Sequence, residues 1–304
     1  MTGEGTRAGL ALGTAQLGLA YGVANRTGAP DGAEAERILR LAVERGVRWL
    51  DTAPGYGDAE ARIGALLPPG TRPDDLRICS KLPALPPGLE SRALRQHITE
   101  ALDGSRRRLR TERLHAWLLH GPDDLDRYGR VLLDALQEHR DAGRVGRIGV
   151  SVYGPAGAAA LLEVPELQAV QLPYNLLDRR CAEGGLMSRL AAGGVLRFAR
   201  SALLQGLLVL DPASRSPTDP ATDWLLRVRA LLTRHGLDPV AGAVAFAAMS
   251  GADFVVLGAE RADQLSGALD ALHTPLPSAF LAEVTAGLAD PPLDVIDPRR
   301  WEAA

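Results

Sequence analysis

Short apolar runs alternate with longer amphipathic stretches along this chain, and the pair recurs about every thirty to forty residues. Apolar runs bounded by glycine or polar residues are typical of buried strands, and the stretches between them are typical of helices packed on a parallel sheet. The pattern predicts eight strands, at Leu10–Gly13, Val47–Asp51, Leu76–Lys81, Leu114–His120, Arg147–Ser151, Ala169–Leu172, Val195–Ala199 and Phe254–Leu257.

Helix-like segments fill the intervals between the predicted strands. Several of them are followed by a glycine, at Gly46, Gly143, Gly193 and Gly236, where a left-handed residue commonly ends a helix. Eight strand–helix units over about 250 residues have the size of a (β/α)8 barrel. The predicted helices lie around 33–45, 58–67, 90–109, 127–142, 155–162, 182–192, 222–235 and 261–272.

A doubly wound open sheet is the alternative α/β fold. That fold usually places a G-x-G-x-x-G fingerprint after the first strand, and residues 12–18 lack its spacing. We therefore predict a single (β/α)8 TIM barrel domain over residues 1–304. Two segments exceed the eight-unit plan: a long loop at Ser201–Ala221, which is a candidate clamp over the site, and an extra helix within Leu237–Gly251. The tail from Leu276 holds another helix-like stretch and an irregular end that could close over the barrel mouth.

Composition and charge narrow the range of partners. The 304 residues are 46% hydrophobic and carry a net charge of −3, so no global field attracts nucleic acid or an anionic membrane surface. Cys79 and Cys181 lack disulfide-framework or metal-ligand spacing, and the six histidines form no short-spaced pair, so no metal site is expected. Neither a membrane-spanning apolar stretch nor a signal-like start is visible, and a cytoplasmic protein is expected.

Lys81 is the one lysine in a chain with thirty-three arginines. Arginine can replace lysine as a surface cation, but its guanidinium is a wide fork, whereas an ammonium is a compact charge that can lie beside a titrating group. Lys81 ends the apolar run Leu76–Lys81, which argues against a surface lysine that survived by chance. A catalytic or cofactor-linked amine is therefore the first hypothesis.

Titratable side chains end three adjacent predicted strands. In a (β/α)8 enzyme, residues at the carboxyl ends of the strands face the active site. Asp51 ends the second strand, Lys81 the third and His120 the fourth, and a Pro-Gly turn can bring Tyr56 over the same mouth. Each has a plainer explanation, such as a helix cap for Asp51 or a core histidine for His120. Their coincidence at successive strand ends favours an acid–base site.

The four residue types suit proton transfer to a carbonyl oxygen. A phenol with a pKa near 10 is a weak acid at neutral pH, and lowering that pKa to about 7 requires about 4 kcal/mol. A cation about 4 Å away supplies energy of this order. We expect Tyr56 to give or take the proton, Lys81 to tune its pKa, Asp51 to hold Lys81 and His120 to orient a carbonyl oxygen. No GxSxG-like motif marks a nucleophile.

These residues resemble the aldo-keto reductase family. Residues 51–60, which read DTAPGYGDAE, are similar to the family's DTAxxYGxxE signature, and Gly64 fits the glycine that follows it. Lys81 after Ser80, and His120 after two leucines, resemble the family's lysine and histidine motifs, so all four positions of its catalytic tetrad are filled. The resemblance spans nearly the whole chain. It implies a barrel that binds a nicotinamide dinucleotide without a Rossmann domain.

The resemblance also implies where the nicotinamide and the pyrophosphate lie. Residues 148–151 are similar to the family's strand-five motif, whose serine, here Ser151, meets the nicotinamide carboxamide, although Val152 replaces the asparagine that usually follows. Gln171 resembles the strand-six glutamine at the same carboxamide. Residues 200–207 resemble the strand-seven segment that cradles the pyrophosphate. The implied contacts there come from Arg200, Ser201, Leu203, Gln205 and Gly206.

The adenosine end is implied by a segment after the eighth strand. Residues 258–264 resemble the family segment in which a 2′-phosphate meets basic or hydroxyl side chains, which implies Gly258, Arg261 and Gln264. Arg261 could pair bidentately with a phosphate, whereas Glu260 could repel it or cap the helix. Because most of the family uses NADPH, NADPH is the expected cofactor and NADH is the alternative.

The implied reaction is reversible hydride transfer between a dihydronicotinamide and a carbonyl group, with Tyr56 as the proton donor. Aromatic residues are 4% of the chain, so a polar aldehyde, a keto sugar or a small ketone is the expected small-molecule substrate. Two other classes stay open, a dinucleotide-binding regulatory subunit and a non-redox lyase or epimerase, and so does the oligomeric state. The aromatic side chains that could line a substrate pocket are Tyr21, Trp49, Tyr153, Trp224 and Trp301.

Overall fold

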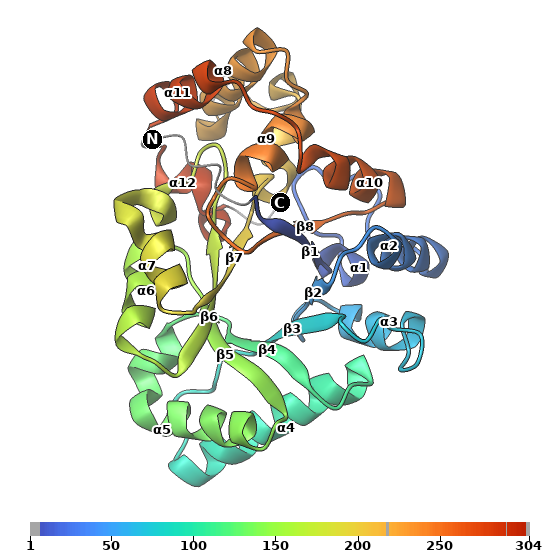
Figure 1. Cartoon of the computed structure of the whole chain (residues 1–304), viewed down its shortest axis with the longest axis vertical. Helices are drawn as coiled ribbons and strands as arrows, with labels where there is room; N and C mark the ends of the chain where they lie inside the picture. Colours follow the sequence, from blue (N-terminus) through green and yellow to red (C-terminus); the bar gives the residue numbers. More distant parts are fainter. Residues whose placement is uncertain (1–6, 217–218, 290, 302–304) are drawn as a thin grey trace.

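Eight parallel strands close into one barrel in the computed structural model, which describes residues 7–216, 219–289 and 291–301 (Figure 1). Each strand pairs with the next along the chain, and β1 pairs with β8, so the predicted (β/α)8 barrel is confirmed. The strands are β1 Gly9–Gly13, β2 Trp49–Asp51, β3 Arg77–Leu82, β4 Leu114–Leu119, β5 Val145–Ser151, β6 Leu167–Pro173, β7 Leu196–Arg200 and β8 Phe254–Gly258.

Helices surround the barrel in Figure 1, and the strand–helix alternation continues around the ring. Residues between the helices and the outer strand faces form the larger apolar core. The helices are α1 Ala15–Gly18, α2 Gly32–Glu44, α3 Ala59–Leu66, α4 Ser91–Leu109, α5 Asp123–Asp141, α6 Pro155–Ala160, α7 Leu186–Ala192, α8 Pro220–Arg234, α9 Pro239–Ala247, α10 Ala262–Ala271, α11 Ser278–Gly287 and α12 Leu293–Ile296.

Inward-facing side chains fill the part of the barrel where the strands begin. Trp49 lies there, with its ring centroid 5.2 Å from that of Phe198 and 5.8 Å from that of Phe254. Because successive strand residues face opposite sides, Trp49 and Asp51 both point inward, and so do Phe198 and Arg200. The aromatic layer lies two or more residues before the strand ends. The interior is packed below this level, which leaves the carboxyl ends of the strands for a site.

Asp-Pro pairs set the starts of two late helices. The Asp219 side chain accepts a hydrogen bond from Ala221 N at the start of α8, and that of Asp238 accepts from Val240 N at the start of α9. A proline occupies the first helical position of each, where no amide donor is needed. These local signals explain why α8 begins directly after the long loop that follows β7 and why α9 begins soon after α8 ends.

Most predicted boundaries lie within a few residues of the observed ones. Gly46, Gly143 and Gly236 adopt positive φ, as a left-handed cap requires, but Gly193 has φ −76° and Gly194 takes the left-handed position at φ 71°. The cap prediction at Gly193 is therefore wrong by one residue. The predicted helix at 127–142 begins earlier, and a non-helical Gly129 interrupts it (φ 50°, ψ −128°).

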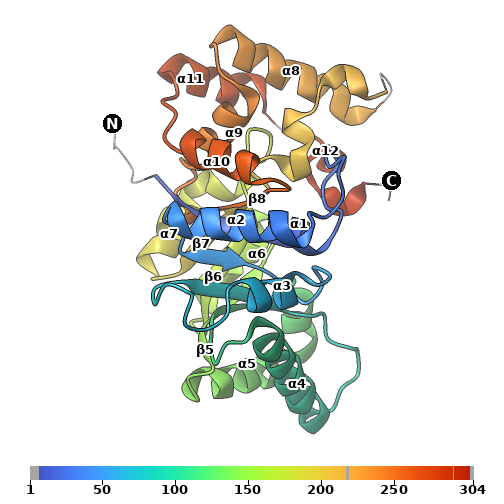
Figure 2. The same ribbon diagram turned by 90° about the vertical axis from the view of Figure 1, so that its right-hand side faces the viewer.

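The segments predicted to exceed the barrel plan take definite form. The extra helix is α9, the tail helix is α11, and the loop after β7 contains 3-10 turns at Leu204–Val209 and Pro212–Ser214. Residues 217–218 of that loop, and the two ends of the chain at 1–6 and 302–304, lie outside the described residues. In Figure 2, α12 and the loop before α2 lie at the same end of the barrel.

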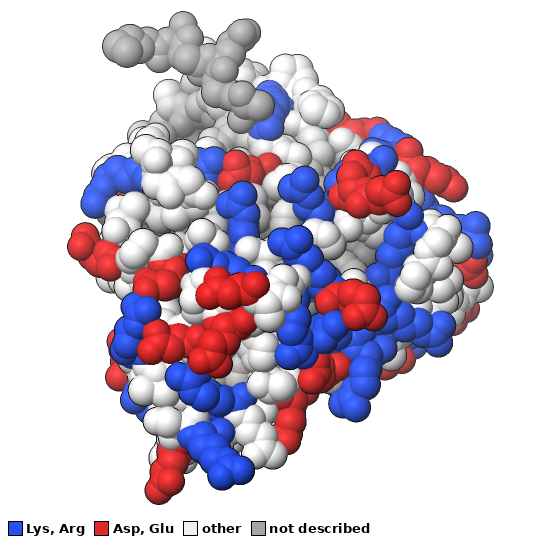
Figure 3. Space-filling view, turned by 60° about the horizontal axis from the view of Figure 1, so that its bottom comes forward, with Lys and Arg blue, Asp and Glu red and all other residues white. Residues whose placement is uncertain are grey.

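Basic and acidic side chains lie among one another on the face shown in Figure 3, which carries α4 and α5. Arg95 pairs with Glu138, and Arg144 pairs with Asp103, so ion pairs cross between neighbouring elements. Within the part of the chain that the structure describes, no helix is long and apolar enough to cross a membrane. The same residues contain no cluster of three or more histidine, cysteine or acidic side chains placed to hold a metal ion.

Candidate active site

A cavity of about 740 Å³ opens at the carboxyl ends of the barrel strands. Its size falls within the range of ordinary ligand sites. Residues from strands that are far apart in sequence converge on it, because the last inward-facing position of each strand points into the same space. The strand-end residues that line it are Gly13, Asp51, Lys81, Ser151, Gln171, Arg200 and Gly258.

Lys81 and Asp51 form a buried ion pair at the base of this cavity. The Lys81 ammonium donates to Asp51 Oδ1 at 2.8 Å and to the Thr52 carbonyl at 3.1 Å, with 2% of the lysine side chain exposed. Gln171 Nε2 donates to the same Asp51 Oδ1 at 2.8 Å. Desolvation opposes the charged ammonium, but the negative charge of Asp51 outweighs it and raises the pKa of Lys81. Lys81 is therefore a fixed cation beside the site.

Tyr56 is held over this pair by a close contact between two turns. Lys81 Nζ lies 5.0 Å from the Tyr56 ring centroid. A Cβ on Gly18 would lie 1.9 Å from the Tyr56 carbonyl, and a Cβ on Gly57 would lie 2.3 Å from the Gly18 carbonyl. Both glycines are therefore needed for the turn that carries Tyr56 to pack here.

The pKa of Tyr56 is raised above its ordinary value. Desolvation is the largest cause, and it outweighs the opposing positive charge of Lys81. The expected lowering of this pKa by Lys81 is therefore not what the structure shows. The phenol is neutral at pH 7 and therefore carries a proton that it can donate.

His120 directly follows β4 and is exposed at the cavity. Desolvation, then the positive charges of Lys81 and Arg200, lower the pKa of His120. Its imidazole is consequently neutral at pH 7 and has one N–H to donate. Asp51, Tyr56, Lys81 and His120 all line this cavity, three of them from strand ends and Tyr56 from the turn after β2.

The turn after β7 carries an unusual run of left-handed residues. Ser201, Leu204 and Gln205 have φ values of 60°, 48° and 55°, and Gly206 has φ 87°. Val23 N donates to the Gln205 carbonyl at 3.0 Å, so the loop after β1 reaches this turn. All the strand-seven residues expected at the pyrophosphate line the cavity, namely Arg200, Ser201, Leu203, Gln205 and Gly206.

The far end of the cavity lies at the start of α10. Gln264 Oε1 accepts hydrogen bonds from the amides of Glu260 and Arg261, at 2.8 and 3.2 Å. Gly258 and Gln264 line the cavity, but Arg261 does not. Its exposed guanidinium pairs with Asp263, with Nε 2.9 Å from Oδ1. The Arg261 guanidinium thus has a carboxylate partner, and its place at a cofactor phosphate stays a prediction.

Three of the five aromatic residues expected to line the cavity do not line it. Trp49 is 3% exposed and belongs to the aromatic layer inside the barrel. Trp224 lies on α8, where Arg227 packs over its ring. Trp301 is likewise absent from the lining, whereas Tyr21 and Tyr153 line it. Trp49 faces the barrel interior like Asp51, but it lies two residues before the end of β2, where the interior is filled by the aromatic layer.

Several lining residues carry no motif that would have revealed them. Asp238, Asp270 and Thr274 come from loops and helices whose approach to the cavity depends on the folded barrel. Thr14 could have been predicted, because it directly follows the first strand. Its hydroxyl donates to the Asp51 carbonyl at 2.9 Å.

The cavity suits an elongated nucleotide. Its lining includes Tyr56 and His120, which follow early strands, and Gln264 of α10. Gly258 lies on its wall, where the Gln16 side chain packs against the bare backbone, with Oε1 2.0 Å from the position that a Cβ would take. Glycine and left-handed turns of this kind allow a backbone to approach a phosphate closely.

Comparison with known proteins agrees with this geometry. The model of the Aldo/keto reductase family matches residues 9–288. Aldo-keto reductase YhdN of Bacillus subtilis (strain 168) is 30% identical over 152 residues, a match that spans 49% of this chain and 46% of YhdN. D-threo-aldose 1-dehydrogenase of a Pseudomonas species is 28% identical over 318 residues and is matched over 95% of its length and 91% of this chain.

A solved structure supports the same fold. The glycerol dehydrogenase AKR11B4 from Gluconobacter oxydans superposes with a TM-score of 0.71 at 24% identity, covering 97% of this chain and 94% of that one. At this identity the likeness concerns the fold alone. The family model, by contrast, extends from β1 to the end of α11. The chain belongs to the Aldo/keto reductase family of oxidoreductases.

Proposed function

We propose that this enzyme reduces an aldehyde or ketone to an alcohol, with Tyr56 as the proton donor and NADPH as the cofactor. The observation that carries this proposal is the buried Lys81–Asp51 pair beneath a neutral Tyr56, with a neutral His120 at the same cavity. A bound dihydronicotinamide supplies the hydride for the carbonyl carbon. The side chains of the cavity then have only to orient the carbonyl and deliver one proton to its oxygen.

The proton comes from the Tyr56 hydroxyl. As that proton leaves, negative charge develops on the phenol oxygen, and the fixed positive charge of Lys81 stabilises it. Asp51 prevents Lys81 from turning away by accepting its hydrogen bond at Oδ1, and Gln171 donates to the same oxygen and so holds Asp51 in place. The neutral imidazole of His120 donates a hydrogen bond to the carbonyl oxygen and so fixes its direction.

We assign the cofactor to the rest of the cavity. Ser151 and Gln171 serve the nicotinamide end, the turn from Ser201 to Gly206 serves the pyrophosphate, and Gly258 and Gln264 serve the adenosine. NADPH is the dinucleotide that the family resemblance favours. The Arg261–Asp263 pair bears on the choice between NADPH and NADH, because a 2′-phosphate would compete with Asp263 for the guanidinium.

A polar, hydroxylated carbonyl compound is the proposed substrate. Two relatives, D-threo-aldose 1-dehydrogenase and the L-glyceraldehyde 3-phosphate reductase of Escherichia coli (strain K12), carry sugar-type carbonyl compounds in their names. Tyr21 and Tyr153 are aromatic residues of the lining, and serine, threonine and glutamine side chains accompany them. Such a wall offers hydrogen bonds to hydroxyl groups rather than a broad apolar surface.

Parallel fluorescence titrations with NADPH and NADH test this function, followed by turnover of aldoses and glyceraldehyde measured as loss of reduced-nicotinamide absorbance. Tight binding with oxidation of the cofactor is the expected result. Binding without turnover of any carbonyl would favour a regulatory subunit. Product formation with no change in nicotinamide absorbance would favour a lyase or epimerase.

A further inference from the structure

Arg200 is a cation at the cavity that pairs with no carboxylate among the residues the structure describes. It is the last residue of β7 and is half-buried. Its Nη1 donates to Ser201 Oγ at 3.1 Å and its Nη2 to the Val152 carbonyl at 3.0 Å, and both acceptors are neutral. A guanidinium has five N–H donors, so its charge and several donors are left for a ligand.

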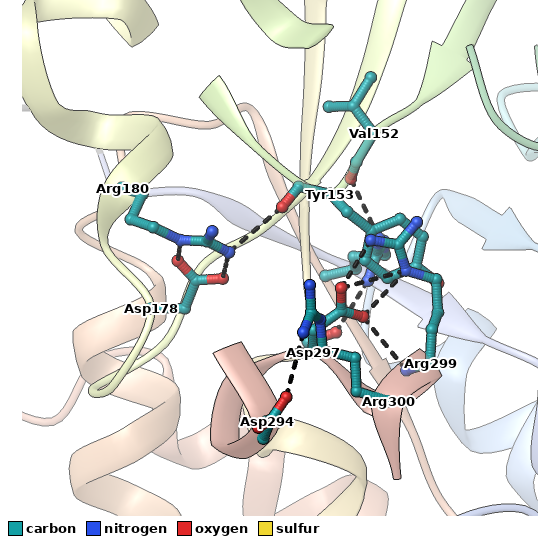
Figure 4. Close-up of polar contacts among 10 residues, drawn as sticks. Val152, Tyr153, Asp178, Arg180, Asp294, Asp297, Arg299 and Arg300 are labelled. Atoms are coloured by element: carbon teal, nitrogen blue, oxygen red, sulfur yellow. Dashed lines mark hydrogen bonds and ion pairs between the residues drawn. The ribbon is translucent and has the colours of Figure 1, made fainter. Parts of the chain in front are cut away.

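Three other arginines, Arg180, Arg299 and Arg300, are each paired with a carboxylate, as Figure 4 shows. Arg180 makes two bonds to Asp178, at 2.8 and 2.9 Å. Arg299 pairs with Asp297 at 2.6 Å, and Arg300 pairs with Asp294 at 3.1 Å. These three positive charges are compensated locally. That of Arg200 is not.

The Arg200 side chain is held in a stack. Its Cζ lies 4.0 Å from the Tyr153 ring centroid, and the Cζ of Arg299 lies 3.6 Å from the same centroid. Two planar guanidinium groups cannot occupy one face of a ring at these distances, so they lie on opposite faces. Arg180 also donates to the Tyr153 carbonyl at 3.2 Å. Because the guanidinium is already ordered, it would lose little freedom on binding a ligand.

Arg200 is also close to the groups that perform the chemistry. Desolvation is the largest effect on three neighbouring groups, and it raises the pKa of Tyr21 and Tyr56 and lowers that of His120, while the positive charge of Arg200 acts to lower all three. At this end of the cavity Lys81 and Asp51 cancel one another, and the two phenols and the imidazole are neutral at pH 7. The end where the carbonyl reacts therefore carries a net positive charge, that of Arg200.

We propose that Arg200 binds an anionic group, a carboxylate or a phosphate, on the carbonyl substrate. This inference rests on the proposed function and adds the charge of its substrate. A guanidinium fork matches either group bidentately. The assignment differs from the role at the cofactor pyrophosphate that the family resemblance implies for residues 200–207, because the neighbours of the Arg200 side chain are Tyr153 and the reacting end of the cavity.

Two matched pairs of substrates test it. Succinic semialdehyde is compared with butanal, and glyceraldehyde 3-phosphate with glyceraldehyde, by kcat/KM at saturating reduced cofactor. Wild type should prefer the anionic member by about 10- to 100-fold in at least one pair. Arg200→Gln should lose most of that preference, and Arg200→Lys, which keeps the charge but not the fork, should keep part of it.

Arg299→Gln is the matched control, since Arg299 stacks on the same ring but is neutralised by Asp297. It should preserve the ratio of anionic to neutral substrates. Circular dichroism checks that each variant is folded, and fluorescence titration checks that it binds the dinucleotide. No preference in wild type for either pair, or an unchanged preference in Arg200→Gln, would overturn the proposal. So would equal losses for both members together with weaker dinucleotide binding.

Failure of the proposed function gives a different result, in which neither member of either pair is reduced by wild type. Calorimetric titration of wild type and Arg200→Gln with succinate and with inorganic phosphate, in the presence of dinucleotide, then still tests the anion site. Binding of one of them that is at least tenfold weaker in the variant would support the role of Arg200. Equal affinities for both anions in the two proteins would refute it.

Discussion

Burial gives Lys81 a role that arginine cannot fill. Its side chain is 2% exposed and fits between Asp51, Thr52 and the Tyr56 ring. Lys81→Arg should therefore lower the rate of carbonyl reduction by about 10²- to 10⁴-fold while the protein still folds, because the wider fork cannot place a point charge beneath the phenol. Steady-state kinetics and circular dichroism measure both effects. Arg40→Lys is the control, because Arg40 forms an exposed ion pair with Glu36, and this variant should keep wild-type activity. Near-wild-type activity of Lys81→Arg would refute the role of the lysine.

The pH profile follows from the two shifted groups. Desolvation raises the pKa of Tyr56, so the phenol keeps its proton up to and beyond its ordinary value of about 10. Desolvation also lowers the pKa of His120, which stays neutral down to and below about 6.5. Single-turnover reduction at saturating cofactor should thus be constant from about pH 7 to about 10 and fall above that range. A decline centred near pH 7 would show instead that the phenol ionises there.

The residues that sequence can predict are those that follow a strand-end rule. Asp51, Lys81 and His120 end successive strands, and their convergence needs only the barrel. The direction of the pKa shift at Tyr56 could not be predicted, because it depends on how much water the folded cavity excludes. The pairing of Arg261 with Asp263 could not be predicted either, because the carboxylates within reach of an exposed arginine side chain depend on the folded structure.

Among the secondary-structure elements, the contact between α3 and α4 depends on a single glycine. A Cβ on Gly64 would lie 2.1 Å from the Arg108 carbonyl. Gly64→Ala should lower the free energy of unfolding by about 1–3 kcal/mol, because the backbone of α4 must move. Gly267→Ala is the control, since Gly267 is also helical and a Cβ there meets nothing within 4 Å. Denaturant unfolding should show it unchanged or slightly more stable. Equal destabilisation of both variants would contradict the packing argument.

The positions of helices and strands could be predicted where apolar residues recur at regular intervals. They were harder to predict where the conformation of a turn fixes the end of an element. All eight strands were found from their apolar runs. The short helix α1 and the loop that brings Val23 to the turn after β7 were not predicted. Such short turns contain too few residues to produce a repeating pattern of apolar positions. The shift of the left-handed cap from Gly193 to Gly194 has the same origin, as either glycine could adopt it.

At the scale of the whole molecule, the two ends of the barrel interior differ: the end where the strands begin is packed with side chains, and the end where they finish contains the cavity. Trp49, Phe198 and Phe254 fill the barrel below the strand ends, and the cavity begins directly above them. The prediction that a single domain spans residues 1–304 stays a prediction. The barrel could be predicted from the alternation of strands and helices in the sequence. The loop residues that line the cavity could not, because they come together only when the barrel closes.

Transfer of label tests the central claim most directly. Wild type is supplied with NADPH carrying deuterium at the transferable position of the nicotinamide and with an aldose or succinic semialdehyde, and the alcohol is analysed by mass spectrometry. We predict one deuterium on the former carbonyl carbon for each cofactor oxidised, and loss of this transfer in Tyr56→Phe despite retained dinucleotide binding. Product that contains no deuterium, or that forms without cofactor oxidation, would contradict hydride transfer and leave a non-redox reaction as the function of this barrel.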